Sequence, residues 1–366
     1  MIFLRRTSST PTKNHLPMPC IWAGVNSYRR TTARELQSVI KYCHMSHLQV
    51  AVLRGGPSVE YGVSMNTGAV VLQALAENGF NTKDIIITKQ GQWLDRGLVK
   101  SPEVALQAVD VVFVALHGTY GEDGEVQRIL QRLGIPFTGS RAFPSAVAFN
   151  KHLTKKTLAS HNVLTPESVE VSTDDLEELV TISSNISDSF GPEYIVKPVA
   201  SGSSFGVEHI RAGQSLEEAI RSALETSDRV LVEEFIRGRE ATCATLEDFR
   251  NDKIYVFPAV EIITPRDRQY FDTESKYNGQ TTEICPSRFS YGDRAKIAEV
   301  SGLVHEVLDL AQYSRSDFIV SDKGVYFLEV NTLPGLTSES LYPKAAASVG
   351  LDINALIKHL VLTATC

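Results

Sequence analysis

The residues best suited to bind a metal ion lie in SRSDFIVSDKGVYFLEVNTLPG, residues 314–335. Asp317 begins one predicted strand, and Glu329 and Asn331 lie two positions apart on the next, so these two side chains share a face. They interrupt an apolar strand, where a carboxylate is costly without a cation or another partner. Oxygen ligands from adjacent strands suit Mg²⁺, with phosphate and water oxygens completing its octahedron. The alternative interpretation is a solvated sheet edge.

A loop of small residues between two predicted strands could approach phosphate oxygens closely. In YIVKPVASGSSFGVEHI, residues 194–210, the first strand ends near Lys197, which adds a positive charge. Small residues let backbone N–H groups and hydroxyls come near a phosphate. The GxxxxGK[ST] pattern of a P-loop is absent, and a plain flexible hairpin is the simpler interpretation of this segment alone. The loop contains Gly202, Ser203, Ser204 and Gly206.

Other charged residues could hold a nucleotide. Lys151, Lys197 and Lys276 each lie near a predicted loop or helix start, and a triphosphate needs several positive charges, although single lysines are usually exposed. In VLVEEFIRGRE, residues 230–240, a strand ends in two acids that could accept hydrogen bonds from an adenine amino group and ribose hydroxyls. An ordinary hairpin fits this segment equally well.

Strands and helices alternate from Met45 onward. LQVAVL, DIIIT and DVVFVAL are typical of buried strands, residues 63–77 have helical spacing, and GEVQRILQRLG predicts an amphipathic helix ended by Gly134. This alternation predicts an open, mostly parallel α/β sheet, whose ligands bind beyond the carboxyl ends of the strands. The loops at 55–64 and 117–124 lie at those ends.

After about residue 142 the pattern changes to α+β. NKHLTKKTLASHNV predicts a basic helix, while YIVKPV, GVEHI, RVLVEEFI and EATCATLE are typical of antiparallel strands. Further elements are expected as a helix over 216–224, strands near 255–263, 317–321 and 325–330, and a helix over about 293–312. We predict an extension over 1–44, an N-terminal α/β domain over 45–141, and two α+β subdomains over 142–231 and 232–366.

Composition narrows the class of protein. Of 366 residues, 43% are hydrophobic and 22% charged, which is typical of a soluble globular protein. The net charge of −7 argues against nucleic acid as a partner, and no apolar run approaches the ~20 residues that span a bilayer. The cysteines lack CxxC spacing, so neither a zinc site nor a disulfide framework is predicted, in keeping with a reducing compartment.

The first 44 residues differ from the rest of the chain. Seven Lys and Arg against one acid, Glu35, give them a charge of +6, which leaves −13 for residues 45–366. An overlong start ahead of Met45 is the favoured interpretation. An organellar transit peptide, which is typically Arg- and Ser-rich, and an accessory segment are the alternatives.

Taken together, these motifs resemble one family. Their order and spacing over residues 48–360 are similar to those of the D-alanine–D-alanine ligases of the ATP-grasp superfamily. The resemblance implies an ATP-grasp fold and an enzyme that joins two D-alanines through an acyl phosphate, for peptidoglycan precursor synthesis. It further implies ATP, two Mg²⁺ ions with Mn²⁺ able to substitute, a homodimer and a cytoplasmic location. The motifs are LRGGPSVEYGVSMNTG, ALHGTYGEDGEVQ, IVKPVASGSSFGV, VEEFIRGRE, FDTESKYNGQTTEICP and SRSDFIV…FLEVNTLPGLTSESLYP.

The resemblance also implies residue roles. The glycine-rich loop would close over the phosphates, Glu240 would bind the ribose, and Asp317, Glu329 and Asn331 would carry the metal ions. The implied nucleotide-binding residues are Lys151, Lys197, Ser204, Glu233, Phe235, Ile236, Glu240 and Lys276.

At the amino-acid end, Glu60 would meet the ammonium of the first D-alanine, with His117 nearby. Arg315 and the Gly335 N–H would stabilise the reacting carboxylate and the later oxyanion. Tyr277 would cover the site by hydrogen-bonding Ser203 and Glu60. The second D-alanine would be held by Lys276, Ser340 and Leu341.

The sequence departs from the family pattern in three places. Val199, Ala200 and Ser201 stand where a more polar or basic run is common, Glu234 stands where some members carry a lysine, and residues 1–44 have no counterpart. A ligase of D-alanine with D-lactate or D-serine is the near alternative, against which Tyr277 argues. An inactive ATP-binding module is the other, against which the retained acids and Arg315 argue.

Overall fold

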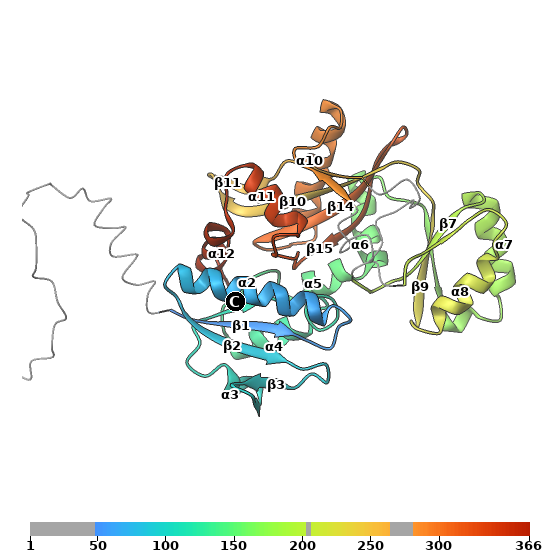
Figure 1. Cartoon of the computed structure of the whole chain (residues 1–366). Helices are drawn as coiled ribbons and strands as arrows, with labels where there is room; N and C mark the ends of the chain where they lie inside the picture. Colours follow the sequence, from blue (N-terminus) through green and yellow to red (C-terminus); the bar gives the residue numbers. More distant parts are fainter. Residues whose placement is uncertain (1–47, 203–205, 264–280) are drawn as a thin grey trace, which may run out of the picture. The chain divides into compact units, whose positions relative to one another are not determined.

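The computed structural model describes residues 48–202, 206–263 and 281–366, which fold into three β-sheets with flanking helices (Figure 1). Each sheet has its own strand order, and each predicted group of strands is present. Four predicted site residues lie outside the described residues: Ser203, Ser204, Lys276 and Tyr277.

The N-terminal sheet has the order β4-β3-β2-β1-β5. β1 pairs in parallel with β2 and β5, as the alternating pattern predicts, but β2/β3 and β3/β4 are antiparallel. β3 and β4 form a tight hairpin: Arg96 and Gly97 both have positive φ, +53° and +78°, as a two-residue type I′ turn requires. The strands are β1 Gln49–Gly55, β2 Asn81–Ile87, β3 Trp93–Asp95, β4 Leu98–Lys100 and β5 Val111–Val114.

The helices of this part follow the strands along the chain. α4 ends at Gly134, whose φ of +65° explains why glycine stops the helix there. Side chains tie α2 to the C-terminal helix α12, since Asn78 donates to the Asn354 carbonyl at 3.0 Å. The helices are α2 Tyr61–Glu77, α3 Pro102–Ala105, α4 Glu125–Leu133 and α5 Ala142–Phe149.

The central sheet is antiparallel, in the order β6-β9-β7-β8. Apolar side chains of β7 and β9 pack with those of α7 and α8 in a separate buried cluster. β9 runs across the predicted boundary after residue 231, so this sheet extends to Glu234. Its elements are α6 Lys151–Leu158, η1 Ala159–His161, β6 Ser168–Ser172, η2 Thr173–Asp175, α7 Leu179–Phe190, β7 Tyr194–Pro198, β8 Glu208–Ile210, α8 Leu216–Leu224 and β9 Arg229–Glu234.

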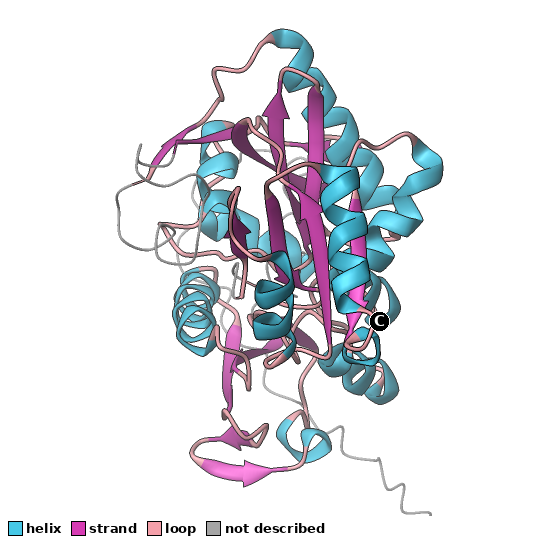
Figure 2. Ribbon diagram, turned by 90° about the vertical axis from the view of Figure 1, so that its right-hand side faces the viewer, coloured by secondary structure: helices cyan, strands magenta, loops and turns pink. Residues whose placement is uncertain are grey.

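The C-terminal sheet is also antiparallel, in the order β13-β12-β10-β14-β15, with β11 paired to β10. Helix α10 packs against β10, β14 and β15, and Figure 2 shows helices lying along the long strands. Its elements are β10 Arg239–Phe249, β11 Asp252–Val256, β12 Val260–Ile263, β13 Thr282–Ile284, α10 Tyr291–Val307, β14 Tyr313–Ser321, β15 Gly324–Asn331, α11 Leu341–Ser348 and α12 Ile353–Leu362.

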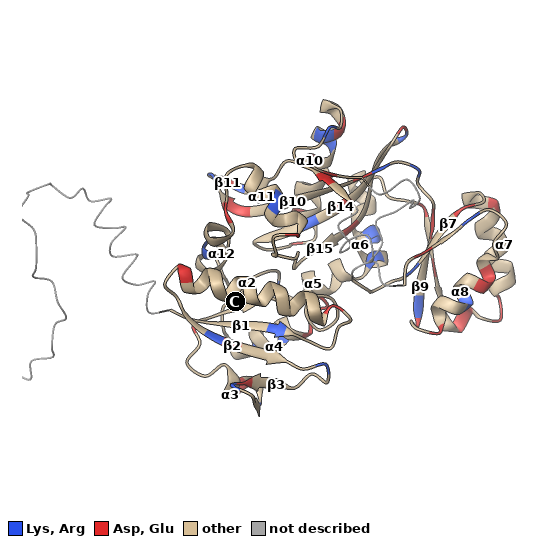
Figure 3. Ribbon diagram, in the orientation of Figure 1, with Lys and Arg blue, Asp and Glu red and all other residues tan. Residues whose placement is uncertain are grey.

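Charge and hydropathy add two observations. Helix α6 carries a concentration of positive charge, from Lys151, Lys155 and Lys156 (Figure 3). Within the described residues, no single helix has the length and apolarity to cross a membrane. The bent pair α11 and α12, at 100° to one another, meets that test only when its two helices are combined.

Candidate active site

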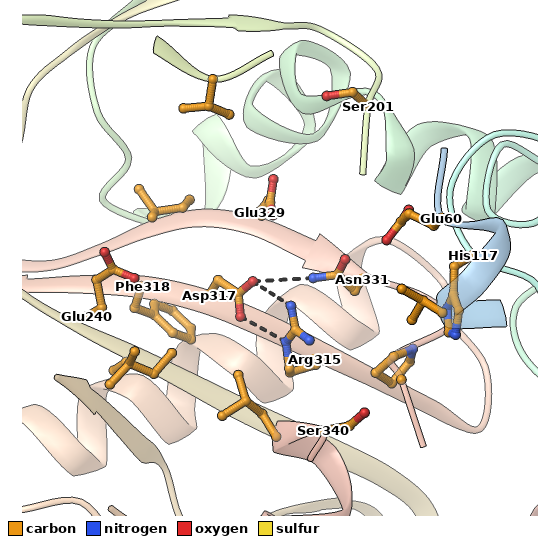
Figure 4. A pocket seen from close by; sticks show the side chains of 18 of the residues that line it. Glu60, His117, Ser201, Glu240, Arg315, Asp317, Phe318, Glu329, Asn331 and Ser340 are labelled. Carbon is orange, nitrogen blue, oxygen red and sulfur yellow. Dashed lines mark hydrogen bonds and ion pairs between the residues drawn. The ribbon is translucent and has the colours of Figure 1, made fainter. Parts of the chain in front are cut away.

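A cavity of about 970 Å³ is lined by residues from the parts of the chain that contain all three sheets. This volume is in the range of small-molecule sites. Figure 4 shows Glu240 at one side of it and Glu60 and His117 at the other. Arg315 and Asp317 lie between them, so the cavity has two ends with a charged middle.

The middle of the cavity is built on the paired strands β14 and β15. Asp317 lies opposite Glu329 and Arg315 opposite Asn331, with a β-bulge directly after Asp317. Because side chains alternate along a strand, Arg315 and Asp317 point to the same face. Bulges of this kind often re-aim side chains beside active sites.

Hydrogen bonds fix these side chains. Arg315 Nε and Nη2 donate to Asp317 Oδ1 and Oδ2 at 3.0 and 2.7 Å. Thr242 Oγ1 donates to Asp317 Oδ1 at 2.6 Å, and Asn331 Nδ2 donates to Oδ2 at 3.3 Å. Glu329 Oε2 lies 3.2 Å from Lys151 Nζ. Both carboxylates therefore face positively charged groups.

This donor set fits a hard divalent cation. Two carboxylates and an amide oxygen from adjacent strands are the ligand types that Mg²⁺ prefers. Among the described residues, no three His, Cys, Asp or Glu side chains gather as a protein-only metal site. A cation here would therefore depend on oxygens of a bound substrate as well, as is usual for Mg²⁺ sites that hold phosphates.

Lys151, at the start of α6, links two parts of the site. Its Nζ donates to the carbonyl oxygen of Ser201 at 2.7 Å, beside the glycine-rich loop. The same ammonium contacts Glu329 on β15. The side chain is only 6% exposed, so its charge is held at a defined place in the cavity.

One turn further along α6, Lys155 takes part in a buried cluster of charges. Glu233 on β9 pairs through Oε1 with Lys155 and through Oε2 with Lys197 at 2.7 Å. Lys155 also donates to the Pro166 carbonyl at 2.9 Å. Burial alone would raise the pKa of Glu233, but Lys197 and Lys155 outweigh it and hold this pKa below its usual value. The carboxylate is therefore ionised and fixed in orientation.

The segment after β9 forms the wall of this end of the cavity. Phe235 and Ile236 line it, and the Phe235 ring stacks on His209 at 4.0 Å between centroids. Glu234 also lines the cavity, where its Oε1 accepts from the Glu167 N–H at 3.0 Å. Glu240, at the start of β10, completes a wall of apolar and acidic groups suited to a base and a ribose.

At the opposite end, Glu60 precedes α2 and lies against two glycines. A Cβ on Gly202 would lie 2.3 Å from Glu60 Oε2, and one on Gly118 would lie 2.6 Å from it. Only glycine permits these approaches. Glu60 therefore sits between the loop at 117–124 and the glycine-rich loop, at a place where it could meet an ammonium group.

The chain then turns sharply through residues 332–335, which we call the 332–335 turn. A Cβ on Gly335 would lie 2.7 Å from Ser340 Oγ, so the turn and the start of α11 are in close contact. Ser340 is the N-cap residue of α11, and Leu341 is its first residue. Backbone N–H groups at a helix start favour a carboxylate. Gly335, Ser340 and Leu341 all line the cavity.

Every described residue that the sequence predicts for the site lines this cavity. These residues are Glu60, His117, Lys151, Lys197, Glu233, Phe235, Ile236, Glu240, Arg315, Asp317, Glu329, Asn331, Gly335, Ser340 and Leu341. Sequence reasoning missed Lys155, Glu122 and Thr242. Lys155 could have been found from its spacing, since it lies four residues after Lys151 on a helix. Thr242 gives no signal, because it stands in a run of small residues.

The three sheets enclose buried lysines at one end of the cavity and an oxygen-ligand cluster in its middle. This combination defines an ATP-grasp protein, and the similar solved structures described below share the fold. The protein-family model described as "D-ala D-ala ligase C-terminus" matches residues 159–362, and the family model described as "D-ala D-ala ligase N-terminus" matches residues 95–140. The chain belongs to the D-alanine–D-alanine ligase family.

Individual relatives agree with this assignment. The D-alanine–D-alanine ligase of Carboxydothermus hydrogenoformans is 33% identical over 318 residues, covering 86% of this chain and 97% of that protein. The D-alanine–D-alanine ligase of Pelobacter propionicus is 35% identical over 319 residues, covering 86% and 96%.

Solved structures are similar over the same region. The VanG D-Ala:D-Ser ligase of Enterococcus faecalis has a TM-score of 0.75 and 29% identity, covering 87% of this chain and 99% of that one. The D-alanine–D-alanine ligase of Coxiella burnetii has a TM-score of 0.73 and 25% identity, covering 87% and 94%.

Proposed function

We propose that this chain joins two D-alanines into D-alanyl-D-alanine with ATP, forming ADP and phosphate. Family membership supports the reaction. The observation that carries it is the position of Arg315 and Asp317 between the wall at Glu240 and the acidic group Glu60. This arrangement suits transfer of a phosphoryl group to an amino acid held at the Glu60 end.

The nucleotide would lie along the lysines. Glu233, Phe235 and Ile236 hold the adenine, Glu240 binds the ribose, and Lys151 and Lys197 contact phosphates. By resemblance, Ser204 also binds the nucleotide. Asp317, Glu329 and Asn331 hold Mg²⁺, which we infer as two ions, with Mn²⁺ able to substitute. When bound, these ions supply neutralisation of charge on the transferring phosphoryl group.

The first step makes a carboxylate reactive. Glu60 pairs with the ammonium of the first D-alanine, and Arg315 pairs with its carboxylate. A carboxylate oxygen attacks the terminal phosphorus of ATP, the bond to the bridging oxygen breaks, and ADP leaves. The product is an acyl phosphate, which water would hydrolyse, so the site must be closed during its lifetime. By resemblance, Tyr277 with Ser203 closes it.

The second step forms the peptide bond. The second D-alanine, held by Lys276, Ser340 and the N–H of Leu341, attacks the acyl carbon with its neutral amine. The tetrahedral intermediate carries an oxyanion, which Arg315 and the Gly335 N–H stabilise. Phosphate then leaves and the amine loses its proton. We identify no strong general base among these residues, so the amine enters in its neutral form.

The wider role follows from the product. We infer that the dipeptide serves as a precursor of peptidoglycan, that the enzyme works in the cytoplasm, and that it is a homodimer. Light scattering coupled to size-exclusion chromatography would test the last inference. A single species of about 40 kDa, matching the 40.3 kDa chain, would contradict it.

The reaction is tested by measuring phosphate release and dipeptide formation with ATP and Mg²⁺. D-alanine, L-alanine, and D-alanine with D-serine or D-lactate are supplied separately. We expect turnover with D-alanine and none with L-alanine. The similarity to a D-Ala:D-Ser ligase makes D-serine the important comparison. Preferential formation of D-alanyl-D-serine would overturn the proposed acceptor but retain the chemistry.

A further inference from the structure

The loop at 117–124 binds the backbone of Leu333 through a side chain that is itself held in place. His117 Nδ1 donates to the Leu333 carbonyl at 2.8 Å. The carboxyl group of Glu122 accepts from the N–H of Gly118, the residue after His117, at 2.9 Å. His117 and Glu122 are 5% and 6% exposed, so neither contact competes with bulk water.

The hydrogen bonds of His117 define its protonation. A carbonyl oxygen only accepts, so Nδ1 carries the hydrogen. Burial lowers the pKa of His117 and favours the neutral ring, which leaves Nε2 to accept from the Thr67 hydroxyl at 2.9 Å. Both ring nitrogens are thus occupied inside the protein. His117 is therefore better suited to position a neighbouring group than to take a proton from the substrate.

The position of the Leu333 backbone affects the neighbouring groups proposed for catalysis. It lies two residues before Gly335, whose N–H faces the oxyanion in the proposed reaction, and two residues after Asn331. Its own side chain is only 2% exposed and lies against Gly139, where a Cβ would approach it to 2.8 Å. A shift of the Leu333 backbone would therefore move the 332–335 turn relative to Arg315.

We propose that His117 and Glu122 are positioning residues: His117 holds the Leu333 carbonyl, Glu122 fixes the backbone next to His117, and together they place the Gly335 N–H for catalysis. The proposal rests on the proposed function. It connects the loop after β5 of the N-terminal sheet to the turn after β15 of the C-terminal sheet. Neither side chain needs to touch a reacting atom for this role.

The test compares Glu122→Ala and Glu122→Gln with Gln127→Ala. Gln127 is a matched control: it is buried and donates to the Gly121 carbonyl of the same loop at 2.6 Å, and within the described residues it makes no hydrogen bond to Leu333. The readouts are kcat, KM for ATP, and affinity for a phosphinate dipeptide analogue that mimics the tetrahedral carbon. Melting temperatures show which variants fold.

We expect Glu122→Ala to lower kcat about 100-fold, since displacement by about 1 Å has costs of this size, with KM for ATP within about twofold. Affinity for the phosphinate should fall in parallel. Glu122→Gln keeps a carbonyl acceptor and should recover much of the loss, while Gln127→Ala should lower kcat only a few fold. Equal losses in Glu122→Ala and Gln127→Ala, or a matching rise in KM for ATP, would overturn the proposal.

A milder variant covers the case in which Glu122→Ala does not fold. Thr67→Val removes the hydroxyl behind His117 and keeps the volume, so kcat and phosphinate affinity should fall together by about tenfold. Unchanged kcat in Thr67→Val, with Tm unaltered, would contradict a positioning role. If wild-type protein makes no dipeptide in the same assay, the proposed function fails instead, so the two failures are distinguishable.

Discussion

Arg315 and Asp317 form a bidentate ion pair, with nitrogen–oxygen distances of 3.0 and 2.7 Å. They are two residues apart on β14, so one strand face carries the group proposed for the oxyanion and a group proposed for the metal. The fork of the guanidinium matches a carboxylate and fixes its plane. This salt bridge therefore links the proposed oxyanion-binding group, Arg315, directly to a proposed metal ligand, Asp317.

Asp317→Asn tests this joint role. It keeps the size of the side chain but removes the charge that pairs with Arg315 and would attract Mg²⁺. We expect kcat to fall by at least about 100-fold and the Mg²⁺ concentration for half-maximal rate to rise. Steady-state kinetics over a Mg²⁺ series measures both. Asp322→Asn, an exposed position in the turn after β14, is the control and should behave as wild type. Normal Mg²⁺ dependence in Asp317→Asn would refute the metal assignment.

Gly202→Ala tests the close approach of the glycine-rich loop to Glu60. The new Cβ would lie 2.3 Å from Glu60 Oε2, so the loop or the carboxylate must move. We expect KM for D-alanine to rise about tenfold or more. The Tm should stay close to that of wild type, because Gly202 lies outside the helices and strands. Gly292→Ala in α10 is the control, since its nearest atom would lie 3.8 Å away. Equal D-alanine kinetics in the two variants would show that the approach is unimportant.

Lys155→Met tests the buried charge cluster at Glu233. The variant leaves Glu233 with Lys197 alone, which should lower the free energy of unfolding by on the order of 1–3 kcal/mol and raise KM for ATP. Adding Glu233→Gln should cost less than the sum of the two single variants, because Lys155→Met has already removed one of the two ion pairs that Glu233 makes. Denaturant unfolding of the two single variants and the double variant measures the coupling. Lys156→Met, which is exposed on the same helix, should change neither quantity, and purely additive effects would argue against the cluster.

The pH dependence of stability tests the environment of Glu122. Burial, and then the nearby charge of Glu60, raise the pKa of Glu122 from 4.5 to about 8, against the lowering effects of the Gly118 and Leu333 N–H groups and Arg315. The folded state thus binds this proton more tightly than the unfolded state. Its contribution to stability is complete below about pH 4.5 and is lost as the pH rises through about 8.

Glu122→Gln lacks this titration. The Tm of the variant minus that of wild type should therefore become more positive between about pH 6 and pH 9. Differential scanning fluorimetry over this range measures it, with the exposed Glu125→Gln as control. A Tm difference that is flat with pH, or that becomes more negative, would show that Glu122 is ionised throughout.

The amino-acid sequence determined the order of elements and the chemistry available to them. The apolar runs that became β1, β7, β9, β14 and β15 are long or regular enough for their period to be read directly. Short elements were not predicted: β3 and β4 have three residues each, and the hairpin depends on positive φ at Arg96 as well as at Gly97. The sequence rarely indicates that a non-glycine residue will adopt a positive φ.

Candidate residues such as Asp317 and Glu329 could be predicted because an acid inside an apolar strand is costly unless it has a partner. The tertiary structure decided which partner each acid has, because distant segments supply the partners. Glu329 contacts Lys151, 178 positions earlier in the chain, and Asp317 accepts from Thr242. Glu122 shows the same limit. In the sequence it is one acid in GEDG, whereas folding removes it from water and sets it against the backbone of Leu333, more than 200 residues later. Local pattern is enough to predict a strand or a helix start, but a buried charge acquires its pKa and its role only from the groups that the fold brings to it.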